Sequence, residues 1–377
     1  MTPTASISGP GCDVQRLLVT QSPTSAEAVS IVSAGVAYPG MDAEGTTAGA
    51  LRNGRRIWEG MQPGCLDPHQ LREAAGIEPR AARKLDRFSL LALAAARAAV
   101  SRSKLELSEM SDCGIYSGNM FGGWTFTEPQ VRALHRDGLE AVSPYLATAW
   151  FPGAPQGQIS INLGMMGFAK TVTTDRCSGS QAIGLAYERI RAGLQPPLLL
   201  AGGAEAPVTP FVAASLTQIS GCNHSTVEGA AYLLLAAGKK GEVQITGHST
   251  FAVDMRSVGL AERLTQRIAE MSAQIGVEAP NFVLCNIPIE EAREEELSKC
   301  IRADFGEQAE IFFTTEIFGD ALAASGPIAS VAAWELLTEI PSSRSALVIS
   351  LGHQCADLLV FSKPDFQNLA NSGGHVS

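Results

Sequence analysis

The sequence predicts an α/β fold, and three observations indicate this class. Short apolar runs rich in Val, Ile and Leu recur along the chain, segments with helical periodicity lie between them, and Gly and Pro residues mark the turns. Buried strands that alternate with helices are typical of sheets covered on both faces. With 377 residues, the chain is long enough for two lobes or for one large domain with a deep core.

The first half of the chain opens with a segment that lacks hydrophobic periodicity. Residues 1–27 are rich in Ser, Thr, Pro and Gly, and we expect a mobile N-terminal extension there. Residues 29–36 form the first expected strand, which ends at the turn Pro39-Gly40, and residues 87–102 form an alanine-rich helix. Further buried strands are expected at residues 112–117, 170–174, 198–201, 232–237 and 243–248. The helices that fit between them lie at residues 129–137, 178–192 and 206–217.

The second half continues the alternation of helices and strands. Helices are expected at residues 259–275, 290–304 and 321–337. Strands are expected at residues 281–285, 346–350 and 357–361. The sequence shows no internal repeat, so a duplication of lobes is not visible from its periodicity.

The composition narrows the range of functions. A net charge of −10 argues against nucleic-acid binding, because no basic stripe is available to replace counterions on phosphates. The chain is 45% apolar and only 18% charged, which indicates surface hidden in a dimer. Its eight cysteines form no C-x-x-C pair, and no run is apolar over the roughly 18 residues of a membrane span. We therefore expect a reduced, cytoplasmic protein without a metal site, a disulfide framework or a membrane anchor.

The most informative segment is T-V-T-T-D-R-C-S-G-S-Q-A-I-G, residues 171–184. It passes from a β-branched strand through a tight turn into a helix. Such an elbow suits a nucleophile, because the exposed amide groups and the positive end of the helix dipole stabilise an anion. Backbone donors nearby can also hold an oxyanion.

This segment resembles the elbow of the β-ketoacyl synthases, which reads Thr-Ala-Cys followed by two small residues and Gly, with Ala-Ile-Gly further along the helix. Four more motifs follow the family order: D-R-F-S at 86–89, G-Q-I-S-I at 157–161, A-G-G-A-E-A-P-V-T-P at 201–210 and A-A-S-G at 323–326. The resemblance extends from Val29 to Phe361. It implies a thiolase-like fold with two pseudo-repeated lobes in a layered α-β-α-β-α architecture. The implied lobes span residues 28–240 and 241–363, followed by a C-terminal tail at 364–377.

The register of the elbow decides what the resemblance implies for catalysis. Aligning Gly179 and the Ala-Ile-Gly of residues 182–184 with the family places Arg176 at the nucleophile and Cys177 one residue later. One residue turns a helical side chain by about 100°, so we expect Cys177 to point away from the site as a small, partly buried thiol. A cation is disfavoured at this end of a helix, so we also expect Arg176 to have an anionic or carbonyl partner.

The other catalytic positions of the family are also replaced. Active condensing enzymes carry two histidines and a lysine that assist decarboxylation and stabilise charge. The family has its first histidine just after a strand, and here Asn286 takes that place. Thr315 and Asp320 lie where the family has the lysine and the following Gly-His. His353 is near the last catalytic turn but about two residues out of register, so we interpret it as a structural turn histidine. We therefore expect no catalytic residues in this chain.

Loss of the nucleophile, histidine and lysine together resembles the chain-length factors, or KSβ subunits, of type II polyketide synthases. The stretches at residues 119–130 and 143–152 also resemble this branch, and the Asp-Arg elbow resembles its members from polyene-forming, highly reducing systems. The resemblance implies an inactive subunit in an obligate heterodimer with a catalytic ketosynthase. It further implies no cofactor of its own, because acyl chains arrive on the phosphopantetheine of an acyl carrier protein that docks mainly on the ketosynthase.

The resemblance also implies two surfaces. The strand at residues 169–175 would pair antiparallel with its counterpart in the ketosynthase, through Lys170, Thr171, Val172, Thr173 and Thr174. Trp124, Thr127 and Val131 would end a tunnel at the dimer interface and so limit product length. These three residues share one helical face by their i, i+3, i+7 spacing, although Thr127 and Gln130 also fit a capping box. The alternative is that Trp124 and Val131 are core residues.

Three other functions remain open at this point. The chain could be a divergent acyltransferase or ketosynthase that uses Cys177 with His353. It could be a decarboxylating priming subunit, although that class usually has glutamine at the elbow and keeps its histidines. It could also be a homodimeric thiolase-fold binding protein with no synthase partner.

Overall fold

The structure is a computed structural model that describes residues 27–40, 46–54, 56–57, 65–220, 226–253, 259–275, 280–287 and 291–364. The extension expected at 1–27 and the tail expected at 364–377 therefore lie outside the described residues, apart from Glu27 and Pro364. No helix in these ranges combines the length and the apolar character needed to cross a membrane.

A mixed β-sheet forms the framework of the described chain. Its strand order is β3-β2-β4-β5-β1-β6-β10-β9-β7-β8. The strands of the first half are β1 (Val29–Ala37), β2 (Gly114–Gly118), β3 (Ala169–Val172), β4 (Leu198–Glu205) and β5 (Gly229–Ala237). The strands of the second half are β6 (Gln244–Ala252), β7 (Phe282–Asn286), β8 (Glu310–Phe313), β9 (Ser345–Leu351) and β10 (Cys355–Ser362).

The two halves of the sheet repeat one topology. Strands β3-β2-β4-β5-β1 and β8-β7-β9-β10-β6 correspond one to one, with three parallel strands followed by two antiparallel ones in each half. Among the described strands, the two half-sheets are joined where β1 pairs with β6, at Val29 with Ile245 and Ser30 with Gln244. The duplication that the sequence does not show is therefore present in the fold. We propose that the lobes divide at residues 240 and 241, between β5 and β6.

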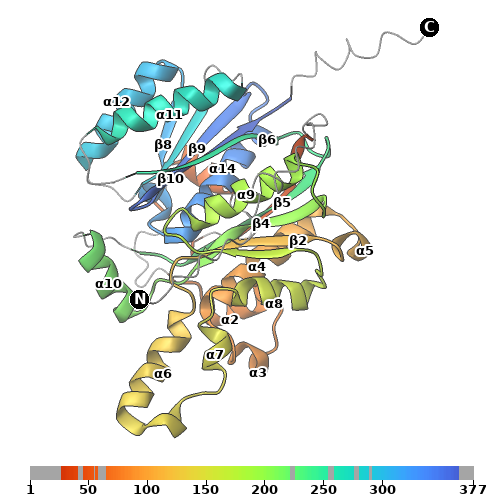
Figure 1. Ribbon diagram of the computed structural model, residues 1–377, viewed down its shortest axis with the longest axis vertical. Helices are drawn as coiled ribbons and strands as arrows, with labels where there is room; N and C mark the ends of the chain where they lie inside the picture. The colour runs from red at the N-terminus through yellow and green to blue at the C-terminus, as the bar shows by residue number, and fades with distance from the viewer. Residues whose placement is uncertain are drawn as a thin grey trace, which may run out of the picture.

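Helices cover both outer faces and fill the space between the two half-sheets (Figure 1). Helices α4 (Arg87–Ser103) and α8 (Ala154–Leu163) cover the first half-sheet, and α11 (Leu260–Ile275) and α12 (Glu291–Phe305) cover the second. Helices α9 (Ser178–Arg191) and α14 (Ser325–Glu339) lie in the middle layer. The predicted α/β class and α-β-α-β-α layering are confirmed.

The middle layer requires small residues and compensated charges. A Cβ on Gly179 of α9 would lie 2.1 Å from the carbonyl oxygen of Ala323, just before α14, so the two helices approach too closely for any larger residue. His248 of β6 ties α9 to the sheet, with Nδ1 2.6 Å from Glu188 and Nε2 3.0 Å from Asp357. Burial alone would lower the pKa of His248, but Asp357 and Glu188 raise it to about 9. The imidazolium is therefore charged at neutral pH.

Shorter helices complete the fold. They are α1 (Thr47–Arg52), α2 (Pro68–Ala75), α3 (Pro79–Ala82), α5 (Leu107–Met110), α6 (Trp124–Asp137), α7 (Leu146–Ala149), α10 (Pro210–Ser220) and α13 (Thr314–Phe318). All nine strands expected from the sequence are present, with bounds that shift by a few residues. Strand β8 was not predicted because it is short and its E-I-F-F pattern does not alternate, and α8 was not predicted because Pro155 and Gly157 interrupt its periodicity.

The start of α6 differs from the prediction. The helix begins at Trp124, more than a turn before the predicted start at Pro129, which lies inside it. The capping box of Thr127 and Gln130 is wrong. The Thr127 hydroxyl donates to the carbonyl oxygen of Gly123 at 2.6 Å, while the Gln130 side-chain oxygen accepts from the N–H of Ser143 at 2.7 Å. Thr127 thus lies inside the first turns of the helix instead of capping it.

The crossing of α9 and α14 yields the first prediction. We expect Gly179→Ala to lower the free energy of unfolding by about 3 kcal/mol or more, because the added methyl group meets a backbone carbonyl that cannot move aside. The matched control is Gly157→Ala in α8, where nothing lies within 4 Å and alanine should be neutral or stabilise by about 0.5–1 kcal/mol. Urea denaturation followed by circular dichroism measures both changes. Equal stability of the two variants would contradict the close approach of the helices.

Candidate functional site at the elbow before helix α9

The elbow between β3 and α9 is a turn held by its own side chains. Asp175 Oδ1 accepts a hydrogen bond from the N–H of Cys177 at 2.9 Å. The Ser178 hydroxyl donates to the carbonyl oxygen of Asp175 at 2.6 Å and accepts from the N–H of Thr174 at 2.9 Å. These bonds fix the direction in which residues 176 and 177 project. The turn is therefore rigid before any substrate or partner is considered.

Arg176 is buried at the start of α9 and forms an ion pair with Asp320, its Nη1 donating to Oδ2. Asp320 is also buried, and its Oδ1 accepts from the N–H of Leu322 at 2.9 Å. This carboxylate, on the same chain, is the anionic partner expected for Arg176. The structure thus brings together the residue that the sequence predicts at the nucleophile position and the residue in the Gly319-Asp320 turn. A guanidinium is a hydrogen-bond donor without an acceptor lone pair, so it is not a nucleophile for a thioester.

Cys177 faces a different part of the molecule from Arg176. Its side chain is fully buried, and Sγ contacts the carbonyl oxygens of Ser350 at 3.3 Å and Cys355 at 3.4 Å. Burial raises the pKa of the thiol well above its usual value, and the neighbouring Cys355 and acidic groups raise it further. The thiolate that nucleophilic catalysis requires is therefore disfavoured at this position.

The other positions where the sequence predicts replaced catalytic residues lie at the end of β7, in α13 and in the turn between β9 and β10. Asn286 is buried at the end of β7, and the Thr315 hydroxyl donates to the carbonyl oxygen of Ile287 at 2.9 Å. His353 is half-buried in the turn between β9 and β10. The next residue, Gln354, donates its N–H to Asp175 Oδ2 at 3.4 Å. The β9–β10 turn therefore rests against the elbow, as the family order of the motifs would place it.

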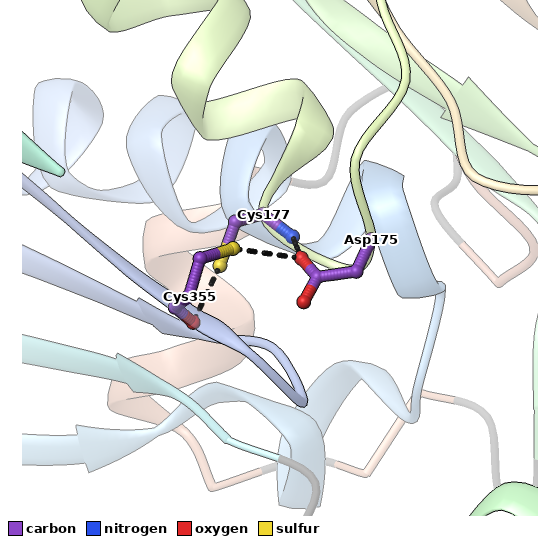
Figure 2. Close-up of side chains that lie close together, drawn as sticks. All are labelled: Asp175, Cys177 and Cys355. Carbon is purple, nitrogen blue, oxygen red and sulfur yellow. Dashed lines mark hydrogen bonds between the residues drawn. The ribbon is translucent and has the colours of Figure 1, made fainter. Parts of the chain in front are cut away.

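A cluster that the sequence analysis missed lies on the Cys177 side of the elbow. Figure 2 shows Asp175, Cys177 and Cys355 side by side. The Cys355 thiol donates to Asp175 Oδ1 at 3.0 Å. No sequence signal could reveal this cluster, because Cys177 and Cys355 are 178 residues apart.

The predicted gate residues lie on α6, which projects from the sheets (Figure 1). Trp124 is half-buried and stacks on Phe211 of α10, with ring centroids 4.3 Å apart. It packs against a small cluster that includes Leu322, two residues from Asp320. Thr127 is half-buried and Val131 is 38% exposed, so Val131 is not a core residue of this chain. Of the three predicted gate residues, Trp124 is the one that packs against this cluster.

Two buried carboxylates hold the segment that leads into α6. Glu205 accepts from the N–H groups of Met120 at 2.6 Å and Phe121 at 3.3 Å. Asp86 accepts from the N–H of Phe126 at 2.6 Å and from the Thr125 hydroxyl at 2.8 Å. Burial raises the pKa of Glu205 to about 8 and that of Asp86 to about 6. These groups fix the position of Trp124 and are themselves covered by protein.

The predicted interface residues lie at the edge of the sheet. Strand β3 is the terminal strand of the first half, and Lys170, Thr173 and Thr174 are exposed, whereas Thr171 is half-buried and Val172 is buried. Large apolar side chains beside this edge are also exposed: Ile161 by 76%, Met166 by 79% and Phe168 by 43%. An exposed edge strand with apolar neighbours is a surface that another chain can cover.

Comparison with known proteins places these features in context. Residues 26–231 match the family described as "Beta-ketoacyl synthase, N-terminal domain". The chain is 32% identical over 143 residues to 3-oxoacyl-[acyl-carrier-protein] synthase 2 of Staphylococcus aureus, covering 37% of this chain and 35% of that protein. It is 34% identical over 128 residues to "Actinorhodin polyketide putative beta-ketoacyl synthase 2" of Streptomyces coelicolor, covering 33% of this chain and 31% of that protein. These matches span about a third of each relative.

The likeness to solved structures covers more of the chain than these sequence matches do. One solved structure, a type II PKS acyl-carrier protein in complex with its ketosynthase bound to the hexaketide, contains a chain with a TM-score of 0.75 and 26% identity. The ishigamide ketosynthase/chain length factor matches with a TM-score of 0.75 and 18% identity, and a beta-ketoacyl synthase from Burkholderia phymatum with 0.73 and 18%. Each comparison covers 90% of this chain and 100% of the solved chain.

The buried ion pair yields the second prediction. We expect Asp320→Leu to lower the free energy of unfolding by about 3–5 kcal/mol, because it leaves the Arg176 guanidinium buried without its counter-charge. Adding Arg176→Met should recover most of this loss, since an apolar pair can replace a buried ion pair at little cost. Thermal and urea unfolding of the two single variants and the double variant form a double-mutant cycle. Additive losses in the double variant would show that the two side chains do not interact.

Proposed function

The chain belongs to the β-ketoacyl synthase family, and from this premise we propose that it is a non-condensing chain-length-factor subunit. In this proposal it pairs with a catalytic ketosynthase and shapes the tunnel that holds the growing chain, in a polyene-type, highly reducing type II polyketide synthase. The acyl chains would arrive on the phosphopantetheine of an acyl carrier protein docked mainly on the ketosynthase. The chain itself would need no cofactor.

The ion pair between Arg176 and Asp320 is the observation that carries the proposal. Condensation requires a thiolate that attacks an acyl thioester and then a site that promotes decarboxylation. At the helix start, where the dipole would favour such a thiolate, this chain has a cation neutralised by a buried carboxylate. The pair joins the elbow to the Gly319-Asp320 turn through a guanidinium and a carboxylate, and it leaves no thiol at this position.

The environment of Cys177 counts against the alternative enzyme that would use it with His353. Its sulfur is fully buried, its pKa is raised by burial, and it lies against backbone carbonyl oxygens that stabilise the thiol form. Selective labelling of Cys177 by an electrophilic acyl analogue would support that alternative.

The exposed edge of the sheet supports a dimer. Among the described strands, β3 has a neighbour on one side only, and apolar residues beside it, including Met166 and Phe168, are exposed. Pairing with a ketosynthase strand across residues 170–174 would satisfy this edge and cover the apolar residues. Obligate interfaces typically bury about 2,000–5,000 Å². The solved ketosynthase/chain length factor is a precedent for such a partner, and we extend it to this chain as part of the proposal.

The third prediction tests the proposal directly. The purified chain, supplied with acyl and malonyl groups on a carrier protein, should form no carbon–carbon bond, whereas its complex with an intact ketosynthase should. Arg176→Cys in the isolated chain should remain inactive, because Asn286 and Asp320 still occupy the histidine positions. Product formation is followed by mass spectrometry of the carrier protein. Steady condensation by the isolated wild-type chain would refute the proposal, and a stable isolated homodimer that ignores the ketosynthase would favour a binding protein.

The fourth prediction concerns product length and rests on the proposed tunnel. Trp124→Ala removes a half-buried ring that stacks on Phe211 and should lengthen products by one or more two-carbon units while the complex stays active. Trp124→Phe is the matched control, because it keeps an aromatic ring against Phe211 and should change product length less. Product distributions of the reconstituted complexes are compared by mass spectrometry. An active Trp124→Ala complex with the wild-type distribution would show that Trp124 is not the gate.

A further inference from the structure

The cluster of Asp175, Cys177 and Cys355 has the composition of a metal-ligand set. One carboxylate oxygen and two sulfur atoms all lie within 4.8 Å of one another. Cys355 Sγ lies 3.0 Å from Asp175 Oδ1, and Figure 2 shows the Cys355 thiol directed at this carboxylate, with the Cys177 sulfur beside it and hydrogen-bonded to the Cys355 carbonyl oxygen. Two ligands come from the elbow and one from the first residue of β10.

We propose that Asp175, Cys177 and Cys355 form a site for one thiophilic divalent cation, such as Zn²⁺. Zinc takes thiolate sulfur at about 2.3 Å and carboxylate oxygen at about 2.0–2.2 Å in tetrahedral geometry, so neighbouring ligand atoms in such a site are separated by distances of the kind seen here. Binding displaces one proton from each thiol and forms two metal–sulfur bonds and one metal–oxygen bond. The fourth position is left to water.

A cation uses all three groups, whereas a disulfide would use only two. Oxidation of the cysteines by a peroxide would form one sulfur–sulfur bond and remove the S–H donor that Asp175 accepts from Cys355. The carboxylate would then face the sulfurs without that partner. A divalent cation replaces the lost donor with a stronger counter-charge and also compensates the two thiolates.

The surroundings allow entry from one side. Cys177 is fully buried, but Cys355 is half-buried at the β9–β10 turn. The backbone of this turn lies against the carboxylate, since a Cβ on Gly352 would be 2.0 Å from Asp175 Oδ2. A bound cation would link the elbow that carries Arg176 to the turn that carries His353. Its role would be to hold these two turns together, independently of the proposed chain-length function.

The spacing of the ligands explains why the sequence analysis expected no metal site. Familiar zinc motifs have paired ligands a few residues apart. Here Asp175 and Cys177 are close in sequence, but Cys355 is 178 residues beyond Cys177.

The test is zinc binding by the purified full chain. The protein is treated with a chelator and a thiol reductant and then titrated with Zn²⁺ against a chromophoric chelator. We expect one equivalent more in the wild type than in Cys355→Ser, and a rise in melting temperature with Zn²⁺ that this variant lacks. Co²⁺ should give sulfur-to-metal charge-transfer absorption that is weakened in Cys355→Ser. The matched control is Cys300→Ser, which changes a half-buried cysteine in α12 and should behave like the wild type.

A second variant covers the case in which Cys355→Ser does not fold. Asp175→Asn keeps a neutral acceptor for the N–H of Cys177 but should bind Zn²⁺ more weakly than the wild type. Equal zinc stoichiometry and affinity in the wild type and both variants would overturn the proposal. So would hydrogen peroxide linking Cys177 to Cys355 at a rate that Zn²⁺ does not slow, because the two thiols would then act as a redox pair. Neither result would affect the condensation assay, so failure of this inference is distinguishable from failure of the proposed function.

Discussion

The close approach of α9 and α14 is the constraint on which the rest of the structure depends. Gly179 allows the start of α9 to lie against the carbonyl oxygen of Ala323, and this contact brings the elbow next to the Gly319-Asp320 turn. A charged side chain at residue 176 is then enclosed between two half-sheets. Burying a cation in such a place is costly unless an anion lies beside it, and Asp320 is that anion.

The same requirement recurs across the core. His248 is held between Glu188 and Asp357, and Arg87 pairs with the buried Glu228. Glu205 accepts backbone N–H groups. Each of these buried side chains has a partner within the chain, which is how such groups are retained in a folded protein. The perturbed pKa values of Glu205 and His248 therefore reflect packing between elements and do not by themselves indicate catalysis.

The surface of the molecule differs from this interior, because it exposes apolar side chains at one edge of the sheet. The elbow is closed by an ion pair, while the edge strand β3 and the apolar residues beside it remain open to solvent in the single chain. Helix α6 extends from the body and is attached near the elbow through Trp124 (Figure 1). The proposed function, a subunit that shapes an assembly, rests on the contrast between the buried ion pair at the elbow and the exposed apolar edge of the sheet.

The sequence by itself determined the alternation of strands and helices, because hydrophobic periodicity reflects which faces are buried. It also predicted that arginine lies where the family has its nucleophile, because this prediction rests on the local register of Gly179 and the residues after it. Only the tertiary structure decided that Asp320, 144 residues away, is the partner of Arg176, and that Cys355 joins Asp175 and Cys177. It also decided the start of α6, where contacts with Phe211 and Leu322 extend the helix before Pro129. Periodicity describes neighbours along the chain, whereas contacts between distant segments depend on the path that the whole chain follows.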